Sequence, residues 1–182
     1  MKKIMLAAAA ACGAYLFMVK GRSGHPGLKQ LQKFSYAHRG LHGNGIPENS
    51  MAAFRAALEK GYGIELDIHL MADGELAVIH DTSLKRTAGV DVKITDLTTA
   101  DLENYPLEGT EEKIPLFSQV LELYAGKAPL IIELKADGNH RALVEAACRA
   151  TSWVVAHSEG PQCPGPLYIR TRCPDTSPNS SL

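Results

Sequence analysis

Two carboxylates share one face of a predicted strand over residues 64–69, because strand side chains alternate between two faces. Glu65, Asp67 and His69 form the polar face, and the alternate positions are isoleucine or leucine. Carboxylates this close repel each other unless a cation lies between them, and hard divalent ions prefer oxygen ligands. The strand indicates a metal site, although an ordinary amphipathic strand with a solvated acidic face has the same alternation.

Polar residues also end three other predicted strands, over residues 34–38, 76–81 and 129–135. The polar residues of these strand ends are His38, His80, and Glu133 with Lys135. In a (β/α) barrel the C-terminal ends of the strands converge on one mouth, where active sites lie. The same arrangement on four strands argues against core histidines and solvated faces, so we expect one shared site.

Periodic apolar residues between the strands predict helices that begin near Ser50 and near Pro115, and a third helix over residues 139–150. Asp73-Gly74 is a tight-turn signal directly after the strand of the acidic pair. Residues 82–113 are irregular apart from a short helix that Thr98 or Thr99 caps. The order strand, helix, strand, strand, helix, strand, helix is typical of an α/β fold.

Composition narrows the function classes. The chain has 182 residues, 45% hydrophobic and 21% charged, which suits a globular domain with a real core. The net charge of -1 provides no overall field for nucleic acid, so we expect no nucleic-acid partner. The four cysteines show no C-x-x-C spacing, which argues against a zinc site.

The N-terminal segment is unlike the rest of the chain. An uncharged apolar run over residues 4–19 lies between Lys2-Lys3 and Lys20 with Arg22. This pattern predicts a hydrophobic helix over residues 1–22 that is a membrane anchor or signal segment, followed by a linker over residues 23–33. We expect a membrane-anchored protein and leave open on which side of the membrane the folded domain lies. Secretion is the alternative.

Several motifs together resemble the glycerophosphodiester phosphodiesterase family, over about residues 36–147. Each is short, but they occur in order and at suitable spacing: His38-Arg39-Gly40, Pro47-Glu48-Asn49-Ser50, Glu65-Leu66-Asp67, Asp73-Gly74, His80-Asp81 with Leu84 and Arg86-Thr87, and Ile132-Glu133-Leu134-Lys135. The resemblance implies a TIM (β/α)8 barrel of the PLC-like phosphodiesterase type, here a partial barrel over residues 34–150. It also implies metal-dependent hydrolysis of small glycerophosphodiesters to glycerol 3-phosphate and an alcohol.

The resemblance assigns roles to individual residues. It implies Glu65, Asp67 and Glu133 as ligands of a divalent cation, Ca2+ or Mg2+. It implies His38 and His80 as the catalytic acid/base pair, and Arg39 and Lys135 as phosphate-binding residues.

The chemistry is consistent with these roles, because histidine titrates near neutral pH and both cations can neutralise phosphate oxygens. Glu48 stays open between a helix N-terminal acid and a neighbour of the metal site. We expect His69 to be structural, and His42 is a weak candidate for substrate contact. Two alternatives to this hydrolase stay open, an inactive half-barrel fragment that retains a cation site and a phospholipase-D-like activity on lysolipids.

The C-terminal residues 151–182 differ from the family pattern. They are rich in proline, serine and cysteine and show almost no periodicity, so we expect an atypical, disordered tail. A full barrel typically takes about 250 residues. We therefore expect a chain truncated or frameshifted after about residue 149, weakly active or inactive, with the strand over 129–135 left as an exposed edge.

Overall fold

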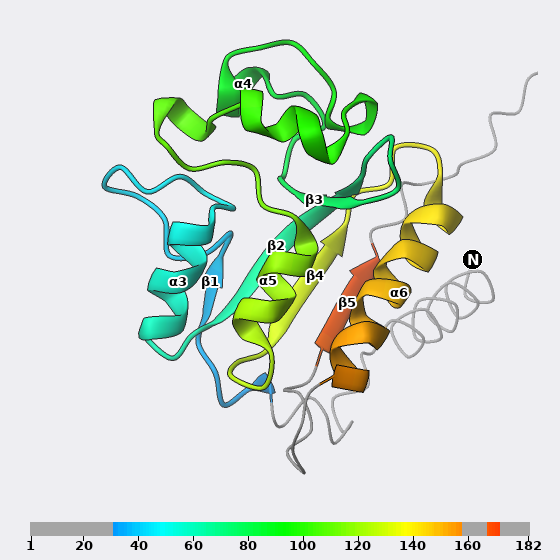
Figure 1. Ribbon diagram of the computed structural model, residues 1–182. Helices are drawn as coiled ribbons and strands as arrows, with labels where there is room; N and C mark the ends of the chain where they lie inside the picture. The colour runs from blue at the N-terminus through cyan, green and yellow to red at the C-terminus, as the bar shows by residue number, and fades with distance from the viewer. Residues whose placement is uncertain (1–30, 158–166, 172–182) are drawn as a thin grey trace, which may run out of the picture. The chain divides into compact units, whose positions relative to one another are not determined.

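A computed structural model describes residues 31–157 and 167–171 of the chain (Figure 1). Its centre is a parallel sheet of four strands in the order β1-β2-β4-β5, and β3 pairs with β2 in the antiparallel direction. The strands are β1 (Tyr36–His38), β2 (Gly63–Leu70), β3 (Leu76–Val78), β4 (Leu130–Leu134) and β5 (Leu167–Thr171).

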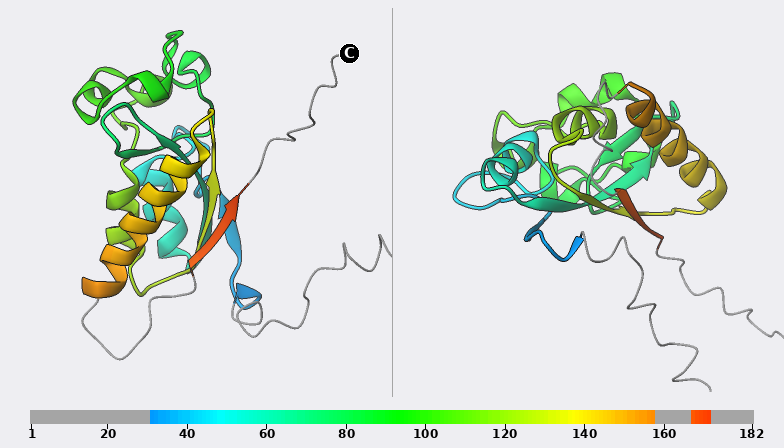
Figure 2. Two further views of the ribbon diagram at one scale, coloured as in Figure 1. Left: turned by 90° about the vertical axis from the view of Figure 1, so that its right-hand side faces the viewer. Right: turned by 90° about the horizontal axis from the view of Figure 1, so that it is seen from below.

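Three helices cover one face of this sheet, as the edge-on view shows (Figure 2). They are α3 (Met51–Glu59), α5 (Phe117–Tyr124) and α6 (His140–His157). Alternate strand residues point under the helices and are almost fully buried in one core: Ile64, Leu66 and Ile68 of β2, and Leu130, Ile132 and Leu134 of β4. Because side chains alternate, the intervening residues of both strands lie on the other face, where the polar residues gather.

The residues between β3 and α5 form a separate lobe near the C-terminal ends of β2 and β4 (Figure 1). The lobe holds α4 (Lys85–Ala88) and three short 3-10 helices, η1 (Ile94–Asp96), η2 (Thr99–Asn104) and η3 (Leu107–Gly109). It has its own core, which includes Leu84, Ile94, Leu102 and Leu107. This second core explains how a segment without regular periodicity still folds.

The α/β fold and the predicted order of elements up to α6 are confirmed. One strand runs differently from the expectation, because β3 is antiparallel to β2, so that His80 does not follow a strand parallel to the others. Asp73-Gly74 forms a turn in which Gly74 has a φ of 87°, which returns the chain directly along β2.

The prediction of a disordered tail over residues 151–182 is wrong for two segments. Helix α6 continues to His157, and residues 167–171 form β5, which pairs with β4 along its whole length. The expected exposed edge at β4 is therefore wrong as well. The prolines that argued against structure lie outside the run Leu-Tyr-Ile-Arg-Thr, whose residue types favour strands.

The predicted N-terminal helix over residues 1–22 and most of the linker lie outside the described residues. Within residues 31–157 and 167–171, no helix is both long enough and apolar enough to cross a bilayer.

Candidate active site

Three acidic residues from two neighbouring strands form what we call the acidic cluster: Glu65, Asp67 and Glu133. Asp67 of β2 and Glu133 of β4 are register partners, and Glu65 lies two residues before Asp67 on the same face. One carboxylate oxygen of each residue lies within 4.8 Å of the others. Parallel pairing of β2 with β4 thus brings together the three residues that the sequence predicted as metal ligands.

Two basic side chains partly offset this charge. Lys135 Nζ lies 2.8 Å from Glu133 Oε1 and 3.1 Å from Asp67 Oδ1. Burial opposes the charged form of Lys135, but the hydrogen bonds to these two carboxylates outweigh it and raise its pKa. Arg39 Nε lies 3.5 Å from Asp67 Oδ2 and makes no hydrogen bond there. Both predicted phosphate-binding residues therefore lie at the acidic cluster.

Glu65 is the carboxylate that these cations satisfy least. Its Oε2 atom is buried and makes no hydrogen bond within the described part of the chain. Burial is the main cause that raises the pKa of Glu65, and the charges of Asp67 and Glu133 raise it further. A hard cation with oxygen ligands would relieve this cost, so the residues present fit a divalent ion.

Asn49 is a site residue that sequence analysis missed. It is 2% exposed, and its Nδ2 donates to Asp67 Oδ2 over 3.2 Å, while its Oδ1 is buried without a hydrogen-bond partner among the described residues. Sequence analysis named Asn49 only as part of the motif Pro47-Glu48-Asn49-Ser50 and gave it no role. Asn49 does not cap α3, because Ser50 Oγ accepts from Ala53 N at 3.1 Å. In the structure Asn49 has a φ of 52°, a conformation that asparagine adopts more readily than most residues, and no periodicity of the sequence predicts it.

The turn after β1 places His38 and Arg39. Arg39 has a φ of 56°, and its backbone N–H donates to Glu65 O over 2.8 Å. Gly40 follows with a φ of 81°, and a Cβ there would lie 2.7 Å from the Cβ of Ala53, so only glycine fits. His38 Nε2 lies 3.7 Å from Glu65 Oε2, and the histidine side chain is 67% exposed. The first predicted catalytic histidine therefore lies at the open edge of the acidic cluster.

His80 reaches the same region by a different route. Since β3 returns along β2, Ile79 N donates to Asp67 O over 3.1 Å, so the backbone just before His80 lies alongside the strand that carries the acidic cluster. His80 Nδ1 lies 2.7 Å from Asp81 Oδ1, and Asp81 Oδ2 accepts from Arg86 Nε over 2.6 Å. Sequence analysis gave Asp81 and Arg86 no role, because nothing in their spacing predicts that they meet.

Glu48 completes this set of contacts. Its Oε1 accepts from Arg86 Nη2 at 2.6 Å and from Arg39 Nη1 at 3.0 Å. Burial opposes the charge of Glu48, but these two arginines outweigh it and lower its pKa. Glu48 is therefore an ion-pair partner beside the acidic cluster, outside helix α3. We call His80, Asp81, Arg86 and Glu48 the His80 network.

His69 and His42, the other two histidines considered in the sequence analysis, differ in their surroundings. His69 is 1% exposed, and its ring nitrogens each lie 3.2 Å from an oxygen, Nδ1 from Asp137 Oδ2 and Nε2 from the backbone oxygen of His80. Burial is the main cause that lowers the pKa of His69. This placement suits the structural role that the sequence predicted. His42 is exposed in the loop before α3.

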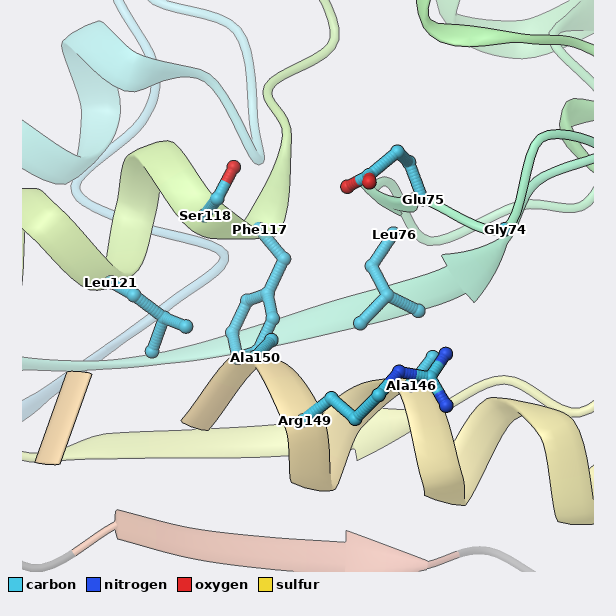
Figure 3. A pocket seen from close by; sticks show the side chains of 9 residues that line it. All are labelled: Gly74, Glu75, Leu76, Phe117, Ser118, Leu121, Ala146, Arg149 and Ala150. Atoms are coloured by element: carbon cyan, nitrogen blue, oxygen red, sulfur yellow. The ribbon is translucent and has the colours of Figure 1, made fainter. Parts of the chain in front are cut away.

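A hollow away from the acidic cluster was also considered as a site. It has a volume of about 290 Å3 and lies between α5, α6 and the turn before β3, with Glu75, Ser118 and Arg149 at its rim (Figure 3). Its apolar wall includes Leu76, Phe117 and Leu121. None of the predicted site residues lines it, so it is not the candidate active site.

Comparison with known proteins matches the part of the chain that contains these site residues. The model of the glycerophosphoryl diester phosphodiesterase family matches residues 38–177, more than half of the chain. The chain belongs to this family. The match begins at His38 and continues well past residue 149, so the expectation that the resemblance stops there is wrong.

Individual relatives agree. A glycerophosphodiester phosphodiesterase from Bacillus altitudinis is 41% identical over 107 residues, which are 55% of this chain and 43% of that protein. A lysophospholipase D from Rattus norvegicus is 36% identical over 116 residues, 57% of this chain and 36% of that protein. The chain thus spans less than half the length of these curated relatives.

Solved structures share the fold. A glycerophosphodiester phosphodiesterase from Thermotoga maritima superposes with a TM-score of 0.61 at 30% identity, over 76% of this chain and 53% of that one. A phosphodiesterase from Oleispira antarctica, solved with the product sn-glycerol-3-phosphate, gives a TM-score of 0.63 at 26% identity, over 78% of this chain and 59% of that one. In both cases the superposed part is little more than half of the solved chain.

Proposed function

We propose that this site hydrolyses glycerophosphodiesters to glycerol 3-phosphate and an alcohol with the help of Ca2+ or Mg2+. The observation that carries the proposal is the acidic cluster, with Arg39, Lys135 and His38 around it and His80 connected through the His80 network. In this proposal the parallel strands form part of a TIM (β/α)8 barrel of the PLC-like phosphodiesterase type, and the site lies at the mouth of the barrel.

Charge is the first requirement of the reaction. A phosphodiester anion repels nucleophiles, so its non-bridging oxygens need positive charge. Glu65, Asp67 and Glu133 would hold a divalent cation, which would supply such charge to the phosphate. Arg39 and Lys135 add the planar fork of a guanidinium and the point charge of an ammonium at the same place.

Proton transfer is the second requirement. The attacking hydroxyl must lose a proton and the leaving alkoxide must gain one, and histidine does both near neutral pH. His80 Nδ1 contacts Asp81 Oδ1, so Nε2 is the ring nitrogen that remains for the substrate. His38 Nε2 is the ring nitrogen near Glu65. The side chain of His38 is exposed, so a substrate can reach it.

A second candidate is hydrolysis of lysolipids of the phospholipase-D type. The similarity to the rat lysophospholipase D favours it. The two reactions break the same kind of bond and differ in whether the glycerol carries an acyl chain. Parallel assays with glycerophosphocholine and lysophosphatidylcholine therefore separate them.

The test measures glycerol 3-phosphate released from glycerophosphocholine by the full chain, with added Ca2+ or Mg2+ and after EDTA treatment. We expect EDTA to stop turnover, and His38→Ala or His80→Ala to lower kcat by about 10²–10⁴-fold. His140→Ala, on an exposed histidine at the start of α6, is the matched control and should change little. Turnover that survives EDTA would contradict the metal, and an absence of turnover would favour the inactive fragment.

We also propose that residues 1–22 anchor the protein to a membrane. Their composition supports this, since an uncharged run over residues 4–19 is flanked by basic residues. The full chain should sediment with membranes after cell lysis, whereas a chain that begins at Gly24 should stay in the supernatant. A full chain with an intact N-terminus that stays wholly in the supernatant would contradict the anchor, and a released chain lacking residues 1–22 would indicate secretion.

A further inference from the structure

Arg86 joins two carboxylates that come from different parts of the fold. It lies on α4 in the lobe, Glu48 lies before α3, and Asp81 follows β3. Arg86 Nη2 donates to Glu48 Oε1 and Arg86 Nε donates to Asp81 Oδ2, each over 2.6 Å. Neither carboxylate is fully exposed, with side-chain exposures of 14% for Glu48 and 29% for Asp81. Such short, charge-assisted contacts fix the orientation of both partners.

The orientation of Asp81 decides which nitrogen of His80 carries the proton. Arg86 occupies Asp81 Oδ2, so that Oδ1 is left to face His80 Nδ1 at 2.7 Å. Burial opposes the charge of Asp81, but the hydrogen bonds from Arg86 and His80 outweigh it and lower its pKa. An ionised carboxylate only accepts hydrogen bonds, so in neutral His80 the proton lies on Nδ1 and Nε2 keeps its lone pair.

We propose that Arg86 is a positioning residue, which holds Asp81 so that His80 keeps the proton on Nδ1 and presents Nε2 to the substrate. This rests on the proposed role of His80 in hydrolysis. The Glu48 contact fixes the other end of Arg86 and ties it to Arg39 at the acidic cluster. One side chain of the lobe thereby sets the relative placement of the acid/base histidine and the phosphate site.

Two other roles for Arg86 predict different results. If Arg86 bound the substrate phosphate directly, its loss would raise KM and leave kcat largely unchanged, because uniform binding would be removed. If Arg86 only fastened α4 to the fold, its loss would lower stability and leave both constants unchanged. A positioning role lowers kcat through His80.

The kinetic test compares Arg86→Ala, Asp81→Asn and the double variant with the wild-type full chain, using glycerophosphocholine. We expect Arg86→Ala to lower kcat by about 10–100-fold, as for other residues that orient a catalytic group, with KM within about threefold. The double variant should lose little beyond the larger single effect, because both changes disturb the same contact. Additive losses, or a kcat within about twofold of wild type, would overturn the proposal.

Two further variants separate positioning from loss of fold. Arg86→Lys keeps one charge but not the fork that reaches both carboxylates, so an intermediate kcat is expected. Arg141→Ala is the matched control, because Arg141 Nε donates to Glu145 Oε1 over 2.8 Å on the exposed surface of α6. It should leave kcat and KM unchanged. Thermal unfolding of each variant shows whether the fold is retained.

A spectroscopic measurement judges the proposal independently of turnover. Histidine 15N chemical shifts distinguish the two neutral tautomers, and the signal of His80 is the one lost in His80→Gln. We expect the Nδ1-protonated form in wild type and in Arg141→Ala, and a shift toward the Nε2-protonated form in Arg86→Ala and Arg86→Lys. An unchanged tautomer in folded Arg86→Ala would overturn the proposal. A wild-type protein without turnover but with the expected tautomer would count against the proposed function alone.

Discussion

The acidic cluster and the His80 network lie in the same site but are held in different ways. The carboxylates of the acidic cluster are placed by the backbone, because β2 and β4 pair in register from Ile64↔Leu130 to Ile68↔Leu134. His80 lies beyond the three-residue strand β3 and is oriented by side-chain contacts with Asp81 and, through it, Arg86.

This difference separates the two kinds of failure that a substitution can cause. Removing a carboxylate from the acidic cluster takes away a proposed metal ligand but leaves the pairing of β2 with β4 intact. Removing Asp81, Arg86 or Glu48 leaves every strand in place but frees His80, the proposed acid/base residue, to rotate. The first should abolish an activity, whereas the second should reduce it.

The largest effect is expected for Glu65→Gln. A neutral amide is a poorer ligand than a carboxylate, so divalent-dependent hydrolysis should be lost. The same change should stabilise the metal-free protein, because burial and the neighbouring carboxylates raise the pKa of Glu65 and make its charge costly. We expect its unfolding temperature in EDTA at pH 7 to rise by about 2–4 °C.

The sign follows from the direction of the shift. A carboxyl group whose pKa is raised on folding favours the folded state most below its unfolded pKa, and this contribution disappears as pH rises through the folded-state pKa. The gain from Glu65→Gln should thus be present at pH 7 and vanish in acid. Asp91→Asn, on an exposed aspartate of the lobe, is the control for amide substitution. A variant that keeps divalent-dependent turnover would contradict the assigned ligand.

A substitution on the buried face of β2 should change the free energy of unfolding. Leu66 lies between Glu65 and Asp67 with 0% exposure, in the core under the helices. Leu66→Ala leaves a cavity and should lower the free energy of unfolding by about 2–5 kcal/mol. Urea unfolding measures this, and Val144→Ala, at an apolar position with 40% exposure, should stay within about 0.5 kcal/mol of wild type. A similar small loss for Leu66→Ala would show that β2 is not packed as described.

The sequence was sufficient to predict what backbone regularity determines. Alternation along residues 64–69 separated Ile64, Leu66 and Ile68 from Glu65, Asp67 and His69, and the structure has the same two faces. The register of β2 with β4 could not be read from either strand, but parallel strands that end in acids predicted the meeting of Asp67 with Glu133. The helices that begin at Met51 and Phe117 followed from apolar periodicity and a nearby proline.

Features that depend on contacts between side chains were largely not predicted. The contacts of Arg86 with Glu48 and Asp81 span 38 and 5 positions and depend on how the lobe folds, which no periodicity reports. The antiparallel direction of β3 was available from Asp73-Gly74, because tight turns join antiparallel strands, but the histidine at the strand end suggested a parallel one. β5 was not predicted because prolines lie on both sides of it, although none lies within Leu167–Thr171.

The smallest effect is expected where the hairpin that carries His80 meets the lobe. Asp73 Oδ2 accepts from the backbone N–H and the hydroxyl of Thr99, at 2.7 Å and 2.8 Å, which ties the turn before β3 to η2. Burial opposes the charge of Asp73, but the bonds from Thr99 outweigh it and lower its pKa. Because the site is exposed, Asp73→Asn should cost only about 0.5 kcal/mol at pH 7.

The pH dependence makes so small an effect measurable. A carboxyl group whose pKa is lowered on folding stabilises the protein above its unfolded pKa of about 3.9, and that contribution is lost as pH falls through the folded-state value. The difference between wild type and Asp73→Asn in urea unfolding should therefore be present at pH 7 and shrink below about pH 4. Asp96→Asn, on an exposed aspartate of η1, is the matched control for the amide substitution. A difference that stays constant from pH 7 to pH 3 would mean that the amide disturbs the turn itself, and that the charge of Asp73 does not hold the hairpin to the lobe.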